Sequence, residues 1–226
     1  MNKLKIALLC ALCTFLSGCS LIYYGAMEHL GKQKRDILVQ RLLAVKKDQQ
    51  ATQQQLKTTL QAFQEVTGFQ GGNLEKVYNK LNKELERSKD RANGLKKRVD
   101  SVDDVAKSMF SEWQGEVQSM HNTALRRQSQ DLLRTARQQH AQYMARMRRT
   151  EENIQPVLQA FNDQVLFLKH NLNARAISSL RKTSAQIDAQ ASALIRDIEM
   201  SSKQADDYIQ TLSRADTQSN TPVKSK

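Results

Sequence analysis

A seven-residue repeat of apolar side chains runs through residues 73–120 and constrains the fold more than any other feature of this chain. One series is Leu74, Leu81, Ser88, Leu95, Val102 and Met109, and its companion is Tyr78, Leu85, Ala92, Val99, Ala106, Trp113 and Met120. A repeat sustained over so many heptads is typical of a coiled-coil helix, because one seam of side chains faces a partner along its length. At 1.5 Å per residue, this helix is about 70 Å long. The repeat therefore predicts an elongated fold with other long helices covering the seam.

Three further segments show helical periodicity and have similar lengths. We expect helices over residues 26–66, 123–169 and 174–213, separated by turns at residues 68–73, near residue 122 and near residue 171. Asn73 is a good N-cap for the second helix, and Asn122 or Thr123 for the third. The seams of these three helices are, in chain order, Leu38, Leu42, Val45, Gln49, Thr52, Leu56, Thr59, Phe63 and Val66; Leu125, Leu132, Ala136, Tyr143, Met147, Ile154, Leu158, Phe161, Val165 and Leu168; and Leu180, Ile187, Leu194, Ile198, Ala205, Tyr208 and Leu212.

The predicted fold is an all-α, long antiparallel coiled-coil bundle over residues 26–214. Equal helices joined by short turns favour four helices. The alternative is a three-helix hairpin whose last helix overhangs, if no break occurs near Asn171. Pro156 interrupts the third helix, but the apolar spacing continues in phase on both sides, which predicts a kink. Residues 215–226 are polar and are expected to be a disordered tail. Gly and Pro are scarce, at 8 and 2 residues, as long helices require.

The N-terminus has the pattern of an export signal. Lys3 and Lys5 precede an apolar run that ends at Leu16-Ser17-Gly18-Cys19. A positive start, a short apolar centre and small residues indicate a signal peptide over residues 1–18, because a membrane span needs about 20 apolar residues. Cys19 after Leu-Ser-Gly resembles the bacterial lipobox, which implies cleavage after Gly18 and acylation of Cys19. The alternative is an ordinary signal peptide with an incidental cysteine.

Residues 19–25 would then form a lipid-anchored segment beside the membrane. In the lipoproteins that the chain resembles, Ser20 after the cysteine favours the outer membrane. Residues 21–24 are Leu-Ile-Tyr-Tyr, which either lie at the headgroup boundary or begin the helical core. The partner expected from this end of the chain is the membrane, through acylated Cys19.

Charge is unevenly distributed along the chain. Without Lys3 and Lys5 it keeps 33 Lys and Arg against 23 Asp and Glu, a formal charge of +10. Residues 100–116 are acidic, and residues 121–149 are basic. One interpretation is pairing across the second and third helices, which fixes register. The other is a site for anionic phospholipid, lipopolysaccharide or cell-wall polymer. The basic residues are Arg126, Arg127, Arg134, Arg137, Arg146, Arg148 and Arg149.

No catalytic or metal-binding pattern is found in the sequence. The histidines are not three or four residues apart, and the Gly-x-Ser-x-Gly motif is missing. Cys10 and Cys13 belong to the predicted signal peptide, so the mature chain has no paired-cysteine motif. A hydrolase would need His121, His140 or His170 within hydrogen-bond reach of a buried carboxylate and a hydroxyl. We therefore expect no enzyme, no metal and no cofactor, and the export signal argues against nucleic-acid binding. Lys226 at the C-terminus resembles the wall-attached lysine of an abundant coiled-coil lipoprotein.

Two regions of the chain, residues 23–28 with 34–39 and residues 164–176, resemble a family of Gram-negative bacterial lipoproteins filed as a domain of unknown function, DUF2959. The resemblance implies a helical fold over nearly all of the mature chain and carries no established activity. In the second stretch, the polar residues either cap a turn or form a partner-binding tip; they are Lys169, His170, Asn171, Asn173 and Arg175. The function expected is a lipid-anchored periplasmic scaffold or spacer without enzymatic activity that meets an envelope protein. The alternative is binding of an anionic envelope polymer by the arginines.

Overall fold

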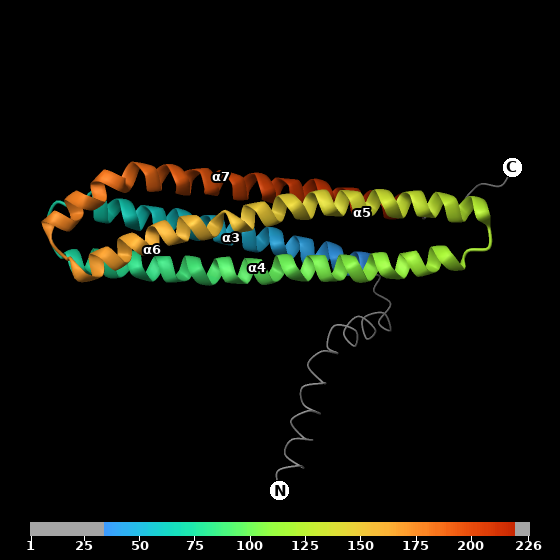
Figure 1. Ribbon diagram of the computed structural model, residues 1–226, viewed down its shortest axis with the longest axis horizontal. Helices are drawn as coiled ribbons and strands as arrows, with labels where there is room; N and C mark the ends of the chain where they lie inside the picture. Colours follow the sequence, from blue (N-terminus) through green and yellow to red (C-terminus); the bar gives the residue numbers. More distant parts are fainter. Residues whose placement is uncertain (1–33, 220–226) are drawn as a thin grey trace, which may run out of the picture.

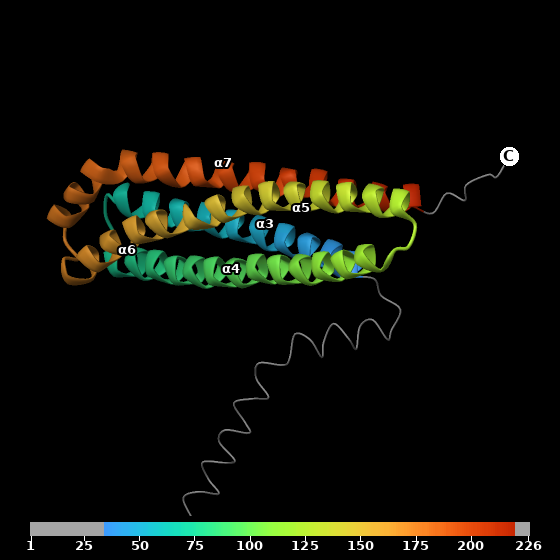
Figure 2. The same ribbon diagram turned by 45° about the vertical axis from the view of Figure 1, so that its right-hand side comes forward.

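A computed structural model describes residues 34–219, with side chains through Leu212. Every regular element in this range is an α-helix. The helices are, in chain order, α3 (Lys34–Thr67), α4 (Leu74–Ser119), α5 (Thr123–Glu152), α6 (Ile154–His170) and α7 (Ala174–Ser219). Helices α5 and α6 follow one another as a single bent rod, so four antiparallel rods lie side by side (Figure 1, Figure 2). The predicted all-α bundle of four helices is confirmed.

The turn near Asn171 decides between the two predicted architectures. Helix α6 ends at His170, and α7 begins at Ala174. The side chain of Asn171 donates to the carbonyl of Phe167 at 2.9 Å, and that of Asn173 accepts from the amide of Ala176 at 3.0 Å. Both amides satisfy backbone groups that a helix end leaves unpaired. The chain therefore reverses here, and the overhanging three-helix alternative is wrong.

The kink predicted in the third rod lies at Asn153, three residues before Pro156. Helix α5 ends at Glu152 and α6 begins at Ile154. Proline cannot donate a hydrogen bond to the carbonyl four residues earlier, and its ring clashes with that carbonyl. For Pro156 this carbonyl belongs to Glu152, the last residue of α5. The break therefore falls where the proline removes a backbone bond.

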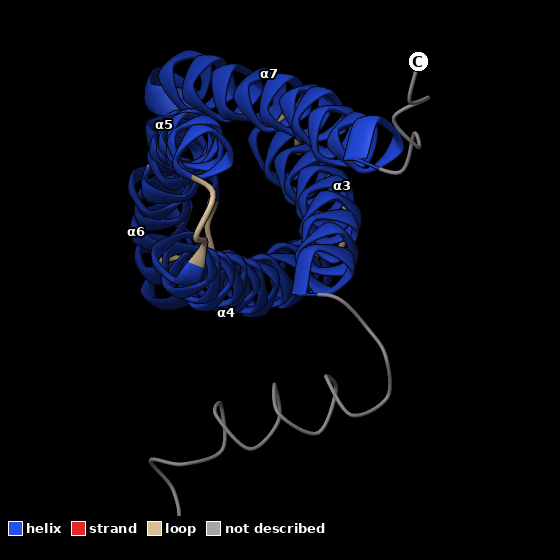
Figure 3. Cartoon of the chain, turned by 90° about the vertical axis from the view of Figure 1, so that its right-hand side faces the viewer, coloured by secondary structure: helices blue, strands red, loops and turns tan. Residues whose placement is uncertain are grey.

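The core follows the predicted seams along the length of the bundle. Helix α3 packs against α4 and α7, and α5 and α6 pack against the same two helices from the opposite corner (Figure 3). The rings of Phe63 and Phe161 meet edge to face, with centroids 5.5 Å apart. The largest side chains that are nearly inaccessible to water are Phe63, Phe161, Leu38, Leu42, Leu56, Leu81, Leu85, Leu95, Met147, Ile154, Leu168 and Leu180.

Polar side chains interrupt this core in the places that the sequence predicted. Gln49 on α3 donates to the hydroxyl of Ser201 on α7 at 2.8 Å, and both are buried. Thr59 donates to the backbone carbonyl of Glu84 at 2.9 Å and lies 2.8 Å from the hydroxyl of Ser88. Because each bond needs its partner at the same level, these pairs fix the register between neighbouring rods.

The bundle has two different ends. The near end carries the start of α3, the α4–α5 turn and the end of α7, and the far end carries the α3–α4 and α6–α7 turns (Figure 1). Two expectations are wrong at the near end. Helix α7 continues to Ser219, so residues 215–219 are helical and do not belong to a disordered tail. Leu125 and Leu132, which we expected in the core, are 56% and 55% exposed.

Candidate functional site

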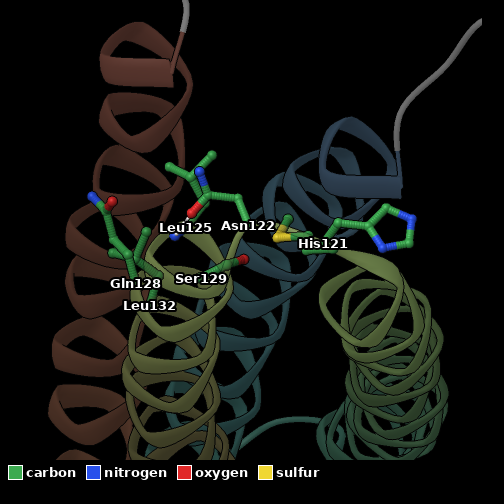
Figure 4. A pocket seen from close by; sticks show the side chains of 7 residues that line it. His121, Asn122, Leu125, Gln128, Ser129 and Leu132 are labelled. Atoms are coloured by element: carbon green, nitrogen blue, oxygen red, sulfur yellow. Dashed lines mark hydrogen bonds between the residues drawn. The ribbon is translucent and has the colours of Figure 1, made fainter.

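An apolar groove lies at the near end of the bundle, along the first two turns of α5. Figure 4 shows Leu125, Gln128 and Leu132 following one another along α5, with His121 on the other side of the turn. The groove is lined by Met120, His121, Asn122, Leu125, Gln128, Ser129 and Leu132. Two exposed leucines one heptad apart make this surface suited to an apolar partner rather than to a charged one.

Two polar contacts hold the groove in shape. The side chain of Asn122 accepts hydrogen bonds from the amides of Ala124 and Leu125 at 3.0 and 3.1 Å, which caps α5 at the turn. Trp113 on α4 donates from its indole Nε1 to the hydroxyl of Ser129 on α5 at 2.9 Å. This bond ties α4 to α5 next to the exposed leucines, so the groove is built on two rigid helices.

The predicted arginine site divides into two groups. Arg148 pairs with Asp100 across the α4–α5 interface, and Arg137 donates to the carbonyl of Phe110 at 3.1 Å. The pair of Arg148 with Asp100 is the cross-helix charge pairing that the acidic and basic stretches predicted, whereas Arg137 joins the same two helices through a backbone carbonyl. Arg134 instead pairs with Asp131 within α5. Five of the seven arginines form no ion pair within residues 34–212, namely Arg126, Arg127, Arg137, Arg146 and Arg149. The seven arginines therefore do not form a single anion-binding site.

A buried histidine, His140, lies where α4, α5 and α7 meet, at a position that the predicted seam of the third helix did not include. Nδ1 of His140 lies 3.1 Å from the hydroxyl of Tyr208, and Nε2 lies 3.7 Å from a carboxylate oxygen of Asp103. Burial lowers the pKa of His140, although Asp103 acts in the opposite direction. The signal for this position was its spacing, because Leu133, His140 and Met147 are seven residues apart and all three are buried.

This cluster does not meet the requirement for a hydrolase. The carboxylate of Asp103 is about a quarter exposed and is beyond hydrogen-bond distance from the imidazole. The hydroxyl belongs to Tyr208, whose pKa is raised by burial, so its deprotonated form is disfavoured. His140 and Tyr208 are 6% and 7% exposed, and a substrate has no access to them. The contacts of the three side chains join α4, α5 and α7.

The far end carries the polar residues predicted as a partner-binding tip. Lys169, His170 and Arg175 are exposed, whereas Asn171 and Asn173 form the caps of the α6–α7 turn. Three apolar side chains surround this turn and are 40–50% exposed, namely Leu166, Phe167 and Leu172. The structure thus supports the cap interpretation for the two asparagines and leaves the charged and apolar residues available for contact.

The two turns of the far end are fastened to each other by one side chain. Arg181 on α7 donates from Nε to the carbonyl of Thr67 at 2.6 Å and from Nη2 to the carbonyl of Phe69 at 2.9 Å. Both carbonyls belong to the end of α3 and its turn into α4. The surface around Phe167 is therefore presented by a held pair of turns.

Several predicted sites lie outside the described residues. These are Gly18 and Cys19 of the lipobox and Lys226 at the C-terminus. Between residues 34 and 219, no cluster of three or more His, Cys, Asp or Glu side chains could hold a metal ion. In the same range, no helix combines the length and the apolar composition that a membrane crossing requires.

Comparison with known families gives one match. Residues 23–212 match the family described as "Protein of unknown function (DUF2959)", which covers most of the chain. The chain belongs to this family. The predicted resemblance is thereby confirmed at the level of the family, and the matched range covers α3 to α6 and α7 as far as Leu212. Neither the curated proteins nor the solved structures gave a match.

Proposed function

We propose that this member of the DUF2959 family is a lipoprotein of the Gram-negative outer membrane. It is anchored on the periplasmic face through acylated Cys19 and acts as a non-enzymatic scaffold or spacer in the envelope. The observation that carries the proposal is the combination of a lipobox and a continuous bundle that starts shortly after it. Lys34, the first residue of α3, lies 15 residues after Cys19.

The arrangement of the helices supports a spacer. Because α3 starts at the near end, an anchor at Cys19 places this end towards the membrane. The far end is then separated from the anchored end by the length of α4, whose 46 residues span about 70 Å. A core that continues along four rods resists bending, since any bend must disturb packed layers. The exposed side chains around Phe167 lie at the end from which a partner is reached.

The anchoring part of the proposal is tested by acyl labelling and envelope fractionation of the wild-type chain and the Cys19→Ser variant. We expect labelled acyl chains and outer-membrane location for the wild type and neither for the variant. A wild-type chain that stays unlabelled and soluble would contradict the anchor. The fold of both proteins is checked by circular dichroism, so that a loss of anchoring is not confused with unfolding.

The partner-binding part is tested by photo-crosslinking in intact envelopes. A crosslinking residue replaces Phe167 at the far end or Leu43 on the outer face of α3; the two side chains are 42% and 49% exposed. We expect a discrete protein adduct from position 167 and none from position 43. Equal adducts from both positions, or adducts from neither, would contradict a far-end contact.

The second candidate function is binding of an anionic polymer or lipid through α5. The observation that favours it is that Arg146 and Arg149 are exposed and form no ion pair within residues 34–212. The test compares Arg146→Gln/Arg149→Gln with Arg137→Gln in salt-dependent binding to vesicles that contain anionic phospholipid. Loss of binding in the double variant alone supports this function, and binding that is unchanged by salt contradicts it.

A further inference from the structure

A cluster of apolar side chains is exposed at the far end of the bundle, beside the α6–α7 turn. Leu166, Phe167 and Leu172 are 50%, 42% and 40% exposed. The residues that face the core in the same part of α6 are Val165 and Leu168, which are 4% and 0% exposed. The core of the far end is therefore complete without the three exposed side chains. Packing of the bundle does not explain why three large apolar side chains gather here, and such clusters mark surfaces that bind partners.

The charge around this cluster has one sign. Residues 164–187 contain four Lys and Arg residues and no Asp or Glu. The carboxylates that flank this stretch, Asp163 and Asp188, both accept hydrogen bonds from glutamine side chains. Lys169 and Arg175 form no ion pair within the described residues. The chain therefore leaves the positive charge of its far end to be balanced from outside.

The helices that carry these cations explain only some of them. Lys169 and His170 lie in the last turn of α6, where positive charge stabilises the helix end. Arg175 lies in the first turn of α7, where positive charge is unfavourable and where no acidic residue compensates for it. The guanidinium of Arg181 is held by two backbone carbonyls, so its charge also lacks a carboxylate. A partner with negative charge would compensate for both arginines.

The exposed apolar and basic residues of this region together form the far-end patch. Its residues are Leu166, Phe167, Lys169, His170, Leu172 and Arg175. Side chains on a helix tilt towards its N-terminus, and α6 runs towards the far end (Figure 1). Leu166 and Phe167 therefore tilt back along the flank of the bundle. A lipid surface that met the end of the rods would touch the turn before it touched these side chains, so a protein segment alongside α6 is the better occupant.

A second copy of the chain does not suit the patch when both copies are anchored as proposed above. The acidic stretch of the chain, residues 100–116, lies in the half of α4 that leads to the near end. Asp100 is 26 residues after Leu74, the first residue of α4, so about 40 Å of helix separates it from the far end. Copies that stand side by side on one membrane therefore hold this stretch well below the patch of their neighbour.

We propose that the far-end patch binds an acidic, amphipathic segment of another envelope protein. Apolar side chains of that segment pack on Phe167 and Leu172, and its Asp and Glu side chains face Lys169 and Arg175. The apolar contacts supply affinity, whereas the opposite charges steer the encounter and fix the orientation. This inference rests on the proposed scaffold function, because it gives the chemistry of the partner that the far end reaches.

The first experiment repeats photo-crosslinking from position 167 in intact envelopes after the charge of the patch has been changed. The crosslinking residue is aromatic, so the apolar contact at this position is retained. Lys169→Glu with Arg175→Glu is expected to reduce the protein adduct on the order of tenfold, because like charges then face each other. The matched control is Arg91→Glu with Lys97→Glu. It makes the same change in net charge on the exposed side of α4 and should leave the adduct unchanged.

A second measurement reads the charge of the partner directly. A carbodiimide activates a carboxylate, and a neighbouring lysine amine then displaces the activating group to form an amide, whereas a guanidinium does not react. The wild type should give an amide between Lys169 and an Asp or Glu of the partner, located by mass spectrometry. Lys169→Arg keeps the positive charge, so it should lose this amide and keep the photo-adduct from position 167. Absence of the amide in the wild type would contradict an acidic partner.

The outcomes separate this inference from the proposed function. A protein adduct from position 167 that survives the charge reversal would overturn the acidic partner and leave the far-end contact in place. An adduct with phospholipid, or with a second copy of the chain, would identify that occupant in its place. No adduct from position 167 would overturn the contact and the inference together. Circular dichroism of each variant checks that the helices are intact, since all the substituted side chains are exposed.

Discussion

Nδ1 of His140 lies 3.1 Å from the hydroxyl of Tyr208, which is 68 residues further along the chain. The bond connects α5 to α7, and the other ring nitrogen faces Asp103 on α4. The ring of Phe110, also on α4, meets the imidazole edge to face. One imidazole therefore contacts three of the four rods in a part of the core where the surrounding side chains are mostly apolar.

This histidine should make the stability of the bundle depend on pH. Burial lowers the pKa of His140, so the folded state holds the ring neutral where an unfolded histidine, with a pKa of about 6.5, takes up a proton. The free energy of unfolding should therefore decrease as the pH falls below about 6.5 and level off below the folded-state pKa. Urea unfolding at several pH values between about 8 and 5 measures this dependence.

The matched variants for this prediction are His140→Gln and His121→Gln. The first removes the titrating group and should flatten the pH dependence, whereas the second alters an exposed histidine at the turn and should leave it unchanged. Asp103 also has a lowered pKa, because Lys107 and His140 outweigh the effect of its burial, but it titrates at lower pH. A slope that persists in His140→Gln would assign the dependence to another group.

The pair formed by Gln49 and Ser201 should respond differently to one substitution than to two. Ser201→Ala leaves the buried amide of Gln49 without its partner and should cost about 1–3 kcal/mol. Gln49→Leu with Ser201→Ala removes both polar groups, together with the oxygen of Gln49 that has no hydrogen-bond partner. The free energy of unfolding of the double variant should be within about 1 kcal/mol of the wild-type value or above it. Urea unfolding of both variants provides the comparison, and equal losses would contradict it.

Two phenylalanines on α6 provide a matched test of core packing. Phe161 is fully buried against Phe63, and Phe161→Ala should lower the free energy of unfolding by about 3–5 kcal/mol because it leaves a cavity. Phe167 is 42% exposed six residues later. Phe167→Ala should change the stability by about 0.5 kcal/mol or less. Thermal or urea unfolding distinguishes the two, and similar losses would place Phe167 in a core contact.

The two asparagines at the ends of α5 should differ as helix caps. Asn122 accepts hydrogen bonds from the amides of Ala124 and Leu125, and Asn122→Ala should cost about 0.5–2 kcal/mol. The side chain of Asn153, between α5 and α6, makes no cap hydrogen bond. The free energy of unfolding of Asn153→Ala, measured with urea, should therefore be within about 0.5 kcal/mol of the wild-type value. A larger loss at position 153 would show that the break between α5 and α6 depends on that side chain.

The periodicity of the sequence predicted the rods because a coiled-coil core is arranged along one dimension. Spacing alone determines which residues face inwards, and Asn73 and Asn122 mark the helix starts through a local side-chain bond. His140 has the same core spacing, but its burial was not predicted because histidines on amphipathic helices are usually exposed. The end of α7 at Ser219 was missed because polar residues are compatible both with a tail and with the outside of a helix.

The candidate surfaces were harder to predict because they depend on how the rods end relative to one another. The acidic and basic stretches predicted that α5 would pair with α4. Which arginines pair depends on how α5 is turned about its own axis, and the structure shows that Arg148 reaches Asp100 while Arg146 is exposed. Likewise, the spacing placed Leu125 in the core, but its side chain is 56% exposed beside the α4–α5 turn.

The antiparallel pairing of α3 with α7 gives the bundle a direction-dependent mechanical strength. The start of α3 and the end of α7 are neighbours at the near end (Figure 3). A force that separates these two points peels the helices apart, and the layers of packed side chains break one after another. A force between the start of α3 and the α6–α7 turn acts along the axis, and every layer must slide at once. The same molecule should therefore yield at low force when peeled and withstand much higher force when stretched.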